Sequence, residues 1–293
     1  MPLLSLPHIN ISYEEYGDPH GAPVLLLHGF PDSAAGWGAL IDAWRGEPVR
    51  WIVPMLRGYG ATRITDSEAE TGEIAALADD LLLLQEALSI DRATWVGHDW
   101  GAGAVFAAAV LRPERVRAVV GLASAYVHSR DTGELPHAQE RDYWYQWFFH
   151  TPQGEQSLTR DRLGLCRYLW QVWSPTWRFP EGDLLEAASA WENPQFVATV
   201  LSYYRTRHGN APGAAPYAGA HAELEKKPKI TVPTWFVVGL ADACNHPEGS
   251  LGQEDWFTGG YERVELPGIG HFIHRQAPEA VAGVLARTLA ETR

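Results

Sequence analysis

Residues 93–110 read ATWVGHDWGAGAVFAAAV, and this stretch decides the fold. A short apolar run at 93–96 is followed by a turn between two glycines and then by an alanine-rich run at 102–110. Small residues two positions either side of Asp99, here Gly97 and Gly101, permit a turn so tight that its central residue is strained. The stretch therefore predicts a strand, a sharp turn and a helix, with Asp99 at the tip of the turn.

The chemistry expected of Asp99 follows from its place at the start of that helix. A carboxylic acid has an ordinary pKa of roughly 4, and a helix N-terminus favours the anion further, so Asp99 needs no base in order to attack. A carboxylate that attacks a saturated, electrophilic carbon forms an ester, which water must cleave afterwards. The stretch favours ring opening or displacement at carbon followed by hydrolysis, although an aspartate after a glycine turn is also typical of a plain helix N-cap.

Composition excludes several classes of protein. The chain has 293 residues, enough for one large or two small domains with a substantial core. A net charge of -13 excludes nucleic acid as a main partner and disfavours an anionic membrane. Residues 1–10 lack a basic signal region, and no apolar run approaches the roughly 18 residues of a membrane span, so we expect a cytoplasmic protein.

The sequence shows no metal or disulfide pattern. Cys166 and Cys244 are its only cysteines, too few for a disulfide framework and without metal-ligand spacing, and we expect both to be buried thiols. The histidines are scattered and form no zinc pattern. We therefore predict that the protein needs no metal or organic cofactor.

Apolar runs alternate with helical stretches from residue 9 to residue 125, which predicts a parallel sheet with crossover helices. The expected strands cover 9–16, 24–27, 49–53, 93–96 and 116–122, and the expected helices cover 34–44, 72–88 and 100–111. Strands resume at 232–238 and 261–266, before a closing helix at 278–289. Because the strands are almost continuously apolar, they should be buried on both faces.

The stretch between residues 125 and 230 differs in sequence pattern from the strand-containing parts on either side of it. Residues 126–229 contain aromatic-rich helical segments, such as 142–149 and 163–173, which prolines interrupt. We interpret this stretch as an inserted helical cap domain, called the lid below. Residues 1–125 and 230–293 would then form the core domain.

Three further pieces each follow an expected strand. The motif HGFP occupies residues 28–31, Asp242 follows the strand at 232–238, and His271 lies in the motif GHF after the strand at 261–266. Nucleophile, acid and histidine in this order resemble the triad of the α/β-hydrolase family over essentially the whole chain. The resemblance implies the α/β-hydrolase fold, with a mostly parallel sheet flanked by helices and an inserted helical lid.

Within that family, Asp99 followed by Trp100 resembles epoxide hydrolases and haloalkane dehalogenases rather than serine esterases. Epoxide hydrolases of this type hold and protonate the epoxide oxygen with two lid tyrosines, and the dipeptides YQ at 145–146 and YR at 204–205 look like those family motifs. A phenol suits the task because it donates a hydrogen bond while neutral. Tyr145 and Tyr204 lie in aromatic-rich segments where packing also explains a tyrosine.

Two neighbouring tyrosines compete for the same roles. Tyr143 precedes Tyr145 by two positions, and Tyr203 directly precedes Tyr204. The sequence leaves open whether one of them replaces the chosen tyrosine.

The resemblance also implies the reaction. Asp99 attacks one epoxide carbon while Tyr145 and Tyr204 donate to the oxygen, and an alkyl-enzyme ester results. His271, oriented by Asp242, then activates the water that cleaves this ester.

The backbone N–H groups of Phe30 and Trp100 would receive the oxyanion that develops during this cleavage. The product is a vicinal diol, and the aromatic lid favours an apolar or aromatic epoxide as the small-molecule substrate.

Two alternatives stay open. A haloalkane dehalogenase would hold the leaving halide with Trp100 and a second indole N–H, or with an asparagine at the position that Phe30 occupies here. Lid tryptophans could supply that second donor, namely Trp144, Trp147, Trp170, Trp173 and Trp177. Fluoroacetate dehalogenases are less similar because they carry arginine after the nucleophile. Some members of the family are ligand binders without catalysis.

Overall fold

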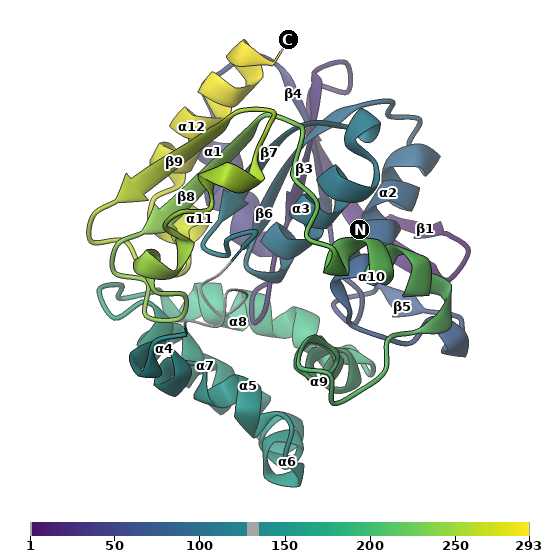
Figure 1. Ribbon diagram of the computed structural model, residues 1–293, viewed down its shortest axis with the longest axis vertical. Coiled ribbons are helices and arrows are strands. Elements are labelled where there is room, and N and C mark those ends of the chain that lie inside the picture. Colours follow the sequence, from purple (N-terminus) through teal and green to yellow (C-terminus); the bar gives the residue numbers. More distant parts are fainter. Residues whose placement is uncertain (1, 128–134, 293) are drawn as a thin grey trace.

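A central sheet with helices on both faces forms most of the computed structural model, which describes residues 2–127 and 135–292 (Figure 1). The strands are β1 (Leu3–Ser5), β2 (Ile9–Gly17), β3 (Ala22–Leu27), β4 (Val49–Pro54), β5 (Arg63–Ile64), β6 (Ala93–His98), β7 (Val116–Leu122), β8 (Thr234–Gly239) and β9 (Tyr261–Leu266). Their order is β1-β2-β4-β3-β6-β7-β8-β9, with β5 paired to β2. β4 to β9 along this order are parallel, whereas β2 is antiparallel to β4. The predicted fold class is confirmed.

Two pairs of helices flank the sheet. In the first pair, α2 (Ile74–Ala87) contacts α3 (Trp100–Leu111), and α3 also contacts β6 and β7. In the second pair, α1 (Gly38–Ala43) contacts α12 (Pro278–Glu291), and α12 also contacts β7 and β8. The short helix α11 (Ile273–Gln276) precedes α12. The expected helix at 34–44 is a 3-10 turn at Ala34–Trp37 followed by α1. Within the described parts of the chain, no helix is long and apolar enough to cross a membrane.

The remaining helices lie between β7 and β8 in the sequence. They are α4 (His137–Asp142), α5 (Trp144–Phe148), α6 (Pro152–Arg160), α7 (Arg162–Trp173), α8 (Glu181–Ser189), α9 (Phe196–Arg207) and α10 (Ala218–Glu225). Helices α4 to α9, the lid helices, gather on one side of the sheet (Figure 1). The expected helical segment at 142–149 is two helices that meet at Tyr143.

Helix α10 differs from the lid helices in its packing. Although it falls within 126–229, it contacts α2 and α3 of the core. Residues 128–134, at the start of the predicted lid, lie outside the described residues. The division into a core and a lid domain with these bounds stays a prediction.

The register of the central strands brings their carboxyl ends together. Leu27 of β3 pairs with Gly97 of β6, Gly97 pairs with Gly121 of β7, and Leu122 of β7 pairs with Val237 of β8. Every residue of β6 and β8 is buried, as continuous apolar runs in a parallel sheet require. The loops that leave these ends therefore meet at one edge of the sheet, on the side where the lid helices lie.

Candidate active site

Asp99 occupies the sharp turn between β6 and α3. Its backbone has φ 54° and ψ -115°, a conformation that is strained for a residue with a Cβ atom. A Cβ atom on Gly101 would lie 2.3 Å from the carbonyl oxygen of Leu27, and one on Gly97 would lie 2.3 Å from that of Gly101. Only glycine fits at both positions, which explains the spacing in the sequence. The Asp99 side chain makes no capping hydrogen bond to α3, so it is not a plain helix N-cap.

Backbone N–H groups face the carboxylate of Asp99. The N–H of Phe30 donates to Oδ1 at 2.9 Å, and the N–H of Trp100 also favours the charged form of the carboxylate. Burial raises the pKa of Asp99, while nearby positive charge and these two N–H groups oppose the rise. The pKa of Asp99 is thus raised from its ordinary value, whereas the sequence predicted that the helix N-terminus would lower it, because burial outweighs that effect. That Asp99 is ionised at neutral pH without a base stays a prediction.

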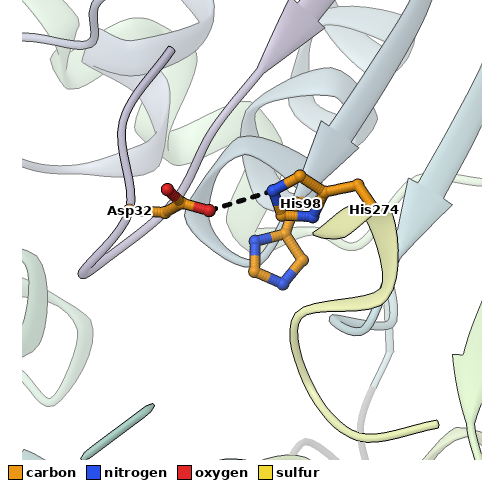
Figure 2. A group of neighbouring side chains, drawn as sticks. All are labelled: Asp32, His98 and His274. Atoms are coloured by element: carbon orange, nitrogen blue, oxygen red, sulfur yellow. Dashed lines mark hydrogen bonds and ion pairs between the residues drawn. The ribbon is translucent and has the colours of Figure 1, made fainter. Parts of the chain in front are cut away.

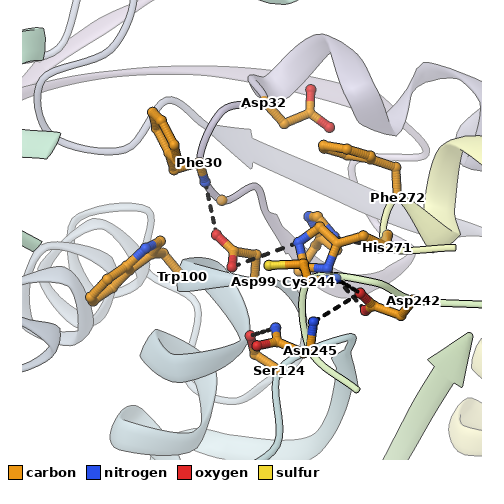
Figure 3. A network of polar contacts seen from close by, with 12 residues as sticks. Phe30, Asp32, Asp99, Trp100, Ser124, Asp242, Cys244, Asn245, His271 and Phe272 are labelled. Atoms are coloured by element: carbon orange, nitrogen blue, oxygen red, sulfur yellow. Dashed lines mark hydrogen bonds and ion pairs between the residues drawn. The ribbon is translucent and has the colours of Figure 1, made fainter. Parts of the chain in front are cut away.

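The other oxygen faces His271. Nε2 of His271 lies 3.8 Å from Oδ2 of Asp99, and Nδ1 lies 2.9 Å from Oδ2 of Asp242 (Figure 3). Nε2 is buried and has no hydrogen-bond partner among the described residues. Burial opposes the imidazolium, but the charge and hydrogen bond of Asp242, with Asp99 nearby, raise the pKa of His271. The ring thus presents a basic nitrogen towards Asp99.

Asp242 is itself held in place by its own loop. Its Oδ1 accepts from the backbone N–H groups of Cys244 at 2.8 Å and Asn245 at 2.9 Å. The Asn245 side chain donates to the hydroxyl of Ser124 at 3.0 Å, which ties this loop to the end of β7 (Figure 3). These bonds leave Oδ2 to orient the imidazole of His271.

Tyr145 from α5 and Tyr204 from α9 lie together in the lid. Both side chains are buried, and their ring centroids are 5.4 Å apart in an edge-to-face arrangement. The Tyr204 hydroxyl accepts from Nε1–H of Trp100 at 3.3 Å, which places it beside the turn that carries Asp99. Burial raises the pKa of both phenols, so both hydroxyls stay protonated at neutral pH.

The two competing tyrosines have other partners. Tyr143 donates its hydroxyl to Oδ1 of Asn245 at 2.6 Å. Tyr203 stacks on the indole of Trp100, with ring centroids 4.6 Å apart. Tyr145 and Tyr204 are therefore the two tyrosines whose rings lie together near Asp99, and their catalytic roles remain a proposal.

Aromatic rings form the surroundings of these groups. The ring of Phe30 lies 6.1 Å from that of Tyr204 and 6.2 Å from that of Trp173. Trp173 in turn lies 5.2 Å from His271. Its indole N–H is buried without a hydrogen-bond partner in the described chain, whereas that of Trp170 donates to the carbonyl of Pro31.

Sequence reasoning missed two residues at the site. Cys244, expected only as a buried thiol, is buried, and its Sγ lies 3.5 Å from the Tyr145 hydroxyl. Its position two residues after Asp242 was a usable signal, because an aspartate often accepts from backbone N–H groups just after it. Gln146 stands in the recognised YQ dipeptide but was given no role, and its Nε2–H donates to the Tyr145 hydroxyl at 3.1 Å.

A second buried cluster lies behind His271. The metal-ligating atoms of Asp32, His98 and His274 lie within 4.8 Å of one another (Figure 2). Both oxygens of Asp32 already accept from Arg275, at 2.9 and 2.6 Å, and His274 bonds Oδ2 at 2.9 Å. Although burial opposes ionisation, Arg275 holds the pKa of Asp32 well below its ordinary value. The guanidinium provides the cation for this carboxylate, so the donor set does not suit a metal ion.

This cluster supports the backbone of the triad histidine. Nε2 of His98 bonds the carbonyl oxygen of His271 at 2.9 Å, and the ring of His98 lies 4.5 Å from that of His274. The histidine that precedes Asp99 in the sequence therefore positions the loop that carries His271.

Comparisons with known proteins agree with this geometry. Residues 22–278 match the family described as the alpha/beta hydrolase fold. An epoxide hydrolase of Caballeronia sordidicola is 28% identical over 92% of this chain and 88% of the relative, and epoxide hydrolase A of Mycobacterium tuberculosis is 28% identical over 96% and 94%. The crystal structure of a "putative epoxide hydrolase" from Klebsiella pneumoniae is 34% identical, covers 98% of this chain and 96% of that chain, and has a TM-score of 0.91. The chain belongs to the α/β-hydrolase fold family.

Proposed function

We propose that this protein hydrolyses an epoxide to a vicinal diol through an ester on Asp99. The observation that carries the proposal is the pair of buried lid hydroxyls, Tyr145 and Tyr204, gathered at a turn where Asp99 faces His271. Two neutral phenols side by side suit the oxygen of a strained ring, which must gain a proton as the ring opens. The relatives named as epoxide hydrolases support the same reaction.

The first half-reaction forms the ester. Oδ1 of Asp99 is held by the backbone N–H of Phe30, whereas Oδ2 faces His271, so we assign Oδ2 as the attacking atom. Its lone pair forms a bond to an epoxide carbon while that carbon's bond to the ring oxygen breaks. The ring oxygen takes a proton from Tyr145 or Tyr204, and the remaining phenol keeps donating to it.

The second half-reaction cleaves the ester. His271 takes a proton from water, whose oxygen attacks Cγ of Asp99, and Oδ1 carries the negative charge between the N–H groups of Phe30 and Trp100. Collapse expels the diol oxygen, which takes the proton from His271. The new carboxyl group of Asp99 loses a proton and the tyrosine phenolate regains one, which balances the cycle.

The arrangement of donors disfavours the dehalogenase alternative. Halide binding by Trp100 needs its indole N–H, and that N–H donates to the Tyr204 hydroxyl. Trp173 offers an indole N–H beside His271, so halide release is the second activity to assay.

The walls of the site suggest the substrate class. Rings of Phe30, Trp173 and Tyr204 lie around the reacting groups, which favours an apolar or aromatic epoxide over a small charged one. The cytoplasmic location that the sequence predicts is also part of this proposal.

A panel of epoxides and haloalkanes, assayed for diol and for halide, tests the function. The proposal expects diol from at least one apolar or aromatic epoxide, and none from the Asp99→Ala variant. Halide release without diol would identify a dehalogenase. Thermal shifts with epoxides but no turnover would identify a non-catalytic binder.

A further inference from the structure

Gln146 links the Tyr145 hydroxyl to a histidine outside the triad. Its side chain is 2% exposed, and its Nε2–H donates to the Tyr145 hydroxyl oxygen at 3.1 Å. Its Oε1 lies 3.0 Å from Nε2 of His208, the residue directly after α9. Neither Gln146 nor His208 has a place in the reaction described above.

We propose that Gln146 is a positioning residue for the first half-reaction, which orients the Tyr145 O–H towards the epoxide oxygen and stabilises the phenolate that proton transfer creates. The inference rests on the proposed function, because it concerns the acid that opens the epoxide. It assigns a role to the amide that neither the triad nor the tyrosine pair contains.

The chemistry of the groups fixes the direction of each hydrogen bond. An amide oxygen only accepts, so Nε2 of His208 must carry the proton that it shares with Gln146. An amide nitrogen only donates, so the oxygen of Tyr145 must accept. The single hydrogen of the phenol then points elsewhere, and among the described residues the other polar atom that bonds this hydroxyl is Sγ of Cys244 at 3.5 Å, a weak acceptor. An epoxide oxygen replaces such an acceptor readily.

The hydrogen bond from the Gln146 N–H has its largest effect after Tyr145 has given its proton to the epoxide oxygen. Burial raises the pKa of Tyr145, and so opposes formation of its phenolate. A hydrogen bond to an ionised oxygen is roughly twice as strong as one to a neutral oxygen. The bond from Gln146 therefore strengthens as the ring opens, and an interaction that is stronger in the transition state than in the ground state raises kcat.

The second tyrosine has a matching arrangement. The oxygen of Tyr204 accepts from the indole N–H of Trp100, as that of Tyr145 accepts from the amide of Gln146. Each phenol thus receives one N–H and has one O–H to give. Trp100 belongs to the core, whereas Gln146 supplies its N–H from within the lid.

Two substitutions test the role of Gln146. Gln146→Met keeps the length of the side chain and removes the donor, and Gln146→Glu keeps the shape but offers an acceptor. The matched control is Gln195→Met, because Gln195 is also a lid glutamine and bonds the backbone of Ile64 rather than a tyrosine. Rapid-quench intact-mass measurements with one epoxide give the rates of ester formation and ester hydrolysis separately.

We expect Gln146→Met to slow ester formation about 10-fold to 100-fold, the usual effect of losing a hydrogen bond to a charged group. Ester hydrolysis should change little, since Tyr145 does not take part in the attack of water. Gln146→Glu should slow ester formation at least as much, because its carboxylate accepts the phenol proton. Gln195→Met should leave both rates close to those of the unmodified protein.

A double-mutant cycle separates positioning from general damage to the lid. In a Tyr145→Phe background, Gln146→Met should have no further effect on ester formation, whereas in a Tyr204→Phe background its full effect should remain. Equal slowing of both half-reactions, unchanged ester formation, or an undiminished effect in Tyr145→Phe would overturn the inference. If Tyr145→Phe itself leaves ester formation unchanged, the proposed role of Tyr145 fails together with the inference; if only Gln146→Met is silent, the inference alone fails.

Discussion

Nε2 of His271 lies 3.8 Å from Oδ2 of Asp99, too far for a direct hydrogen bond and close enough for both atoms to act on one reacting group. A serine nucleophile needs a histidine to take its proton, whereas Asp99 attacks as a carboxylate and does not need His271 for this purpose. The imidazole stays available for the water of the second half-reaction, so the two steps use different catalysts.

The first prediction concerns the origin of the product oxygen. A single turnover in heavy-oxygen water should give diol without label, because the added oxygen comes from Asp99, and label should enter the diol only in later turnovers. Mass spectrometry of the diol measures this. Label in the first-turnover diol would mean that water attacks the epoxide directly.

The second prediction concerns the triad. His271→Gln should still form the ester but hydrolyse it slowly, so intact-mass analysis should show enzyme plus substrate. Asp242→Asn should accumulate less of this adduct, because Asp242 orients the imidazole without transferring the proton itself. A His271→Gln protein that forms no adduct and no burst of product would contradict the role given to His271.

The third prediction concerns the lid tyrosines. Tyr145→Phe or Tyr204→Phe should each lower epoxide turnover about 10-fold to 100-fold, and the double variant should lose more, within the roughly 10² to 10⁴ range of general-acid assistance. Any halide release should barely respond, since halide leaves without protonation. Full epoxide activity in the double variant would remove both tyrosines from the mechanism.

The fourth prediction concerns pH. Hydrolysis needs neutral His271, so its rate should fall as pH drops through the pKa of His271, which in the free enzyme is raised above the ordinary histidine value of about 6.5. Part of this rise comes from Asp99, which is uncharged in the ester. The acid limb of the ester-hydrolysis rate should therefore lie at lower pH than the His271 titration of the free enzyme, followed by NMR; the reverse order would contradict the assignment.

The fifth prediction concerns the stability of the cluster behind His271. Asp32→Asn removes the buried counter-charge of Arg275 and leaves only the more exposed Asp183 at 3.7 Å, which should lower the free energy of unfolding by about 3 kcal/mol or more. Urea unfolding measures the change. The control is Glu114→Gln at the exposed pair with Arg112, where the expected change is about 0 to 1 kcal/mol. Equal effects of the two variants would show that Asp32 does not hold the cluster together.

The sequence predicted the parts of the site that local rules determine. The spacing of Gly97 and Gly101 around Asp99 reflects backbone contacts that exclude a Cβ atom, and the strands around it were predicted to within one or two residues because continuous apolar runs mark a buried parallel sheet. The order of Asp242 and His271 after their strands was equally visible, because parallel strands bring their carboxyl ends to one edge.

Other features depend on contacts between distant segments. No local pattern could show that Gln146 meets His208, or that Cys244 meets Tyr145. The same holds for the raised pKa of Asp99, because it is buried where segments distant in sequence, such as those of Phe30 and His271, meet. Short helices such as α10 also escaped prediction, since packing on the core rather than amphipathic periodicity holds them in place.

The lid leaves the sheet after β7 and returns at β8, and these two strands are direct neighbours in the sheet. The inserted chain leaves at the carboxyl end of β7 and returns to the amino end of the parallel strand β8, and no strand of the described residues lies within it. Descendants of one ancestral gene can exchange or enlarge this segment while inheriting the nucleophile, acid and histidine intact. New substrate ranges can thus arise by evolution in one contiguous stretch of the gene, without rebuilding the hydrolytic machinery.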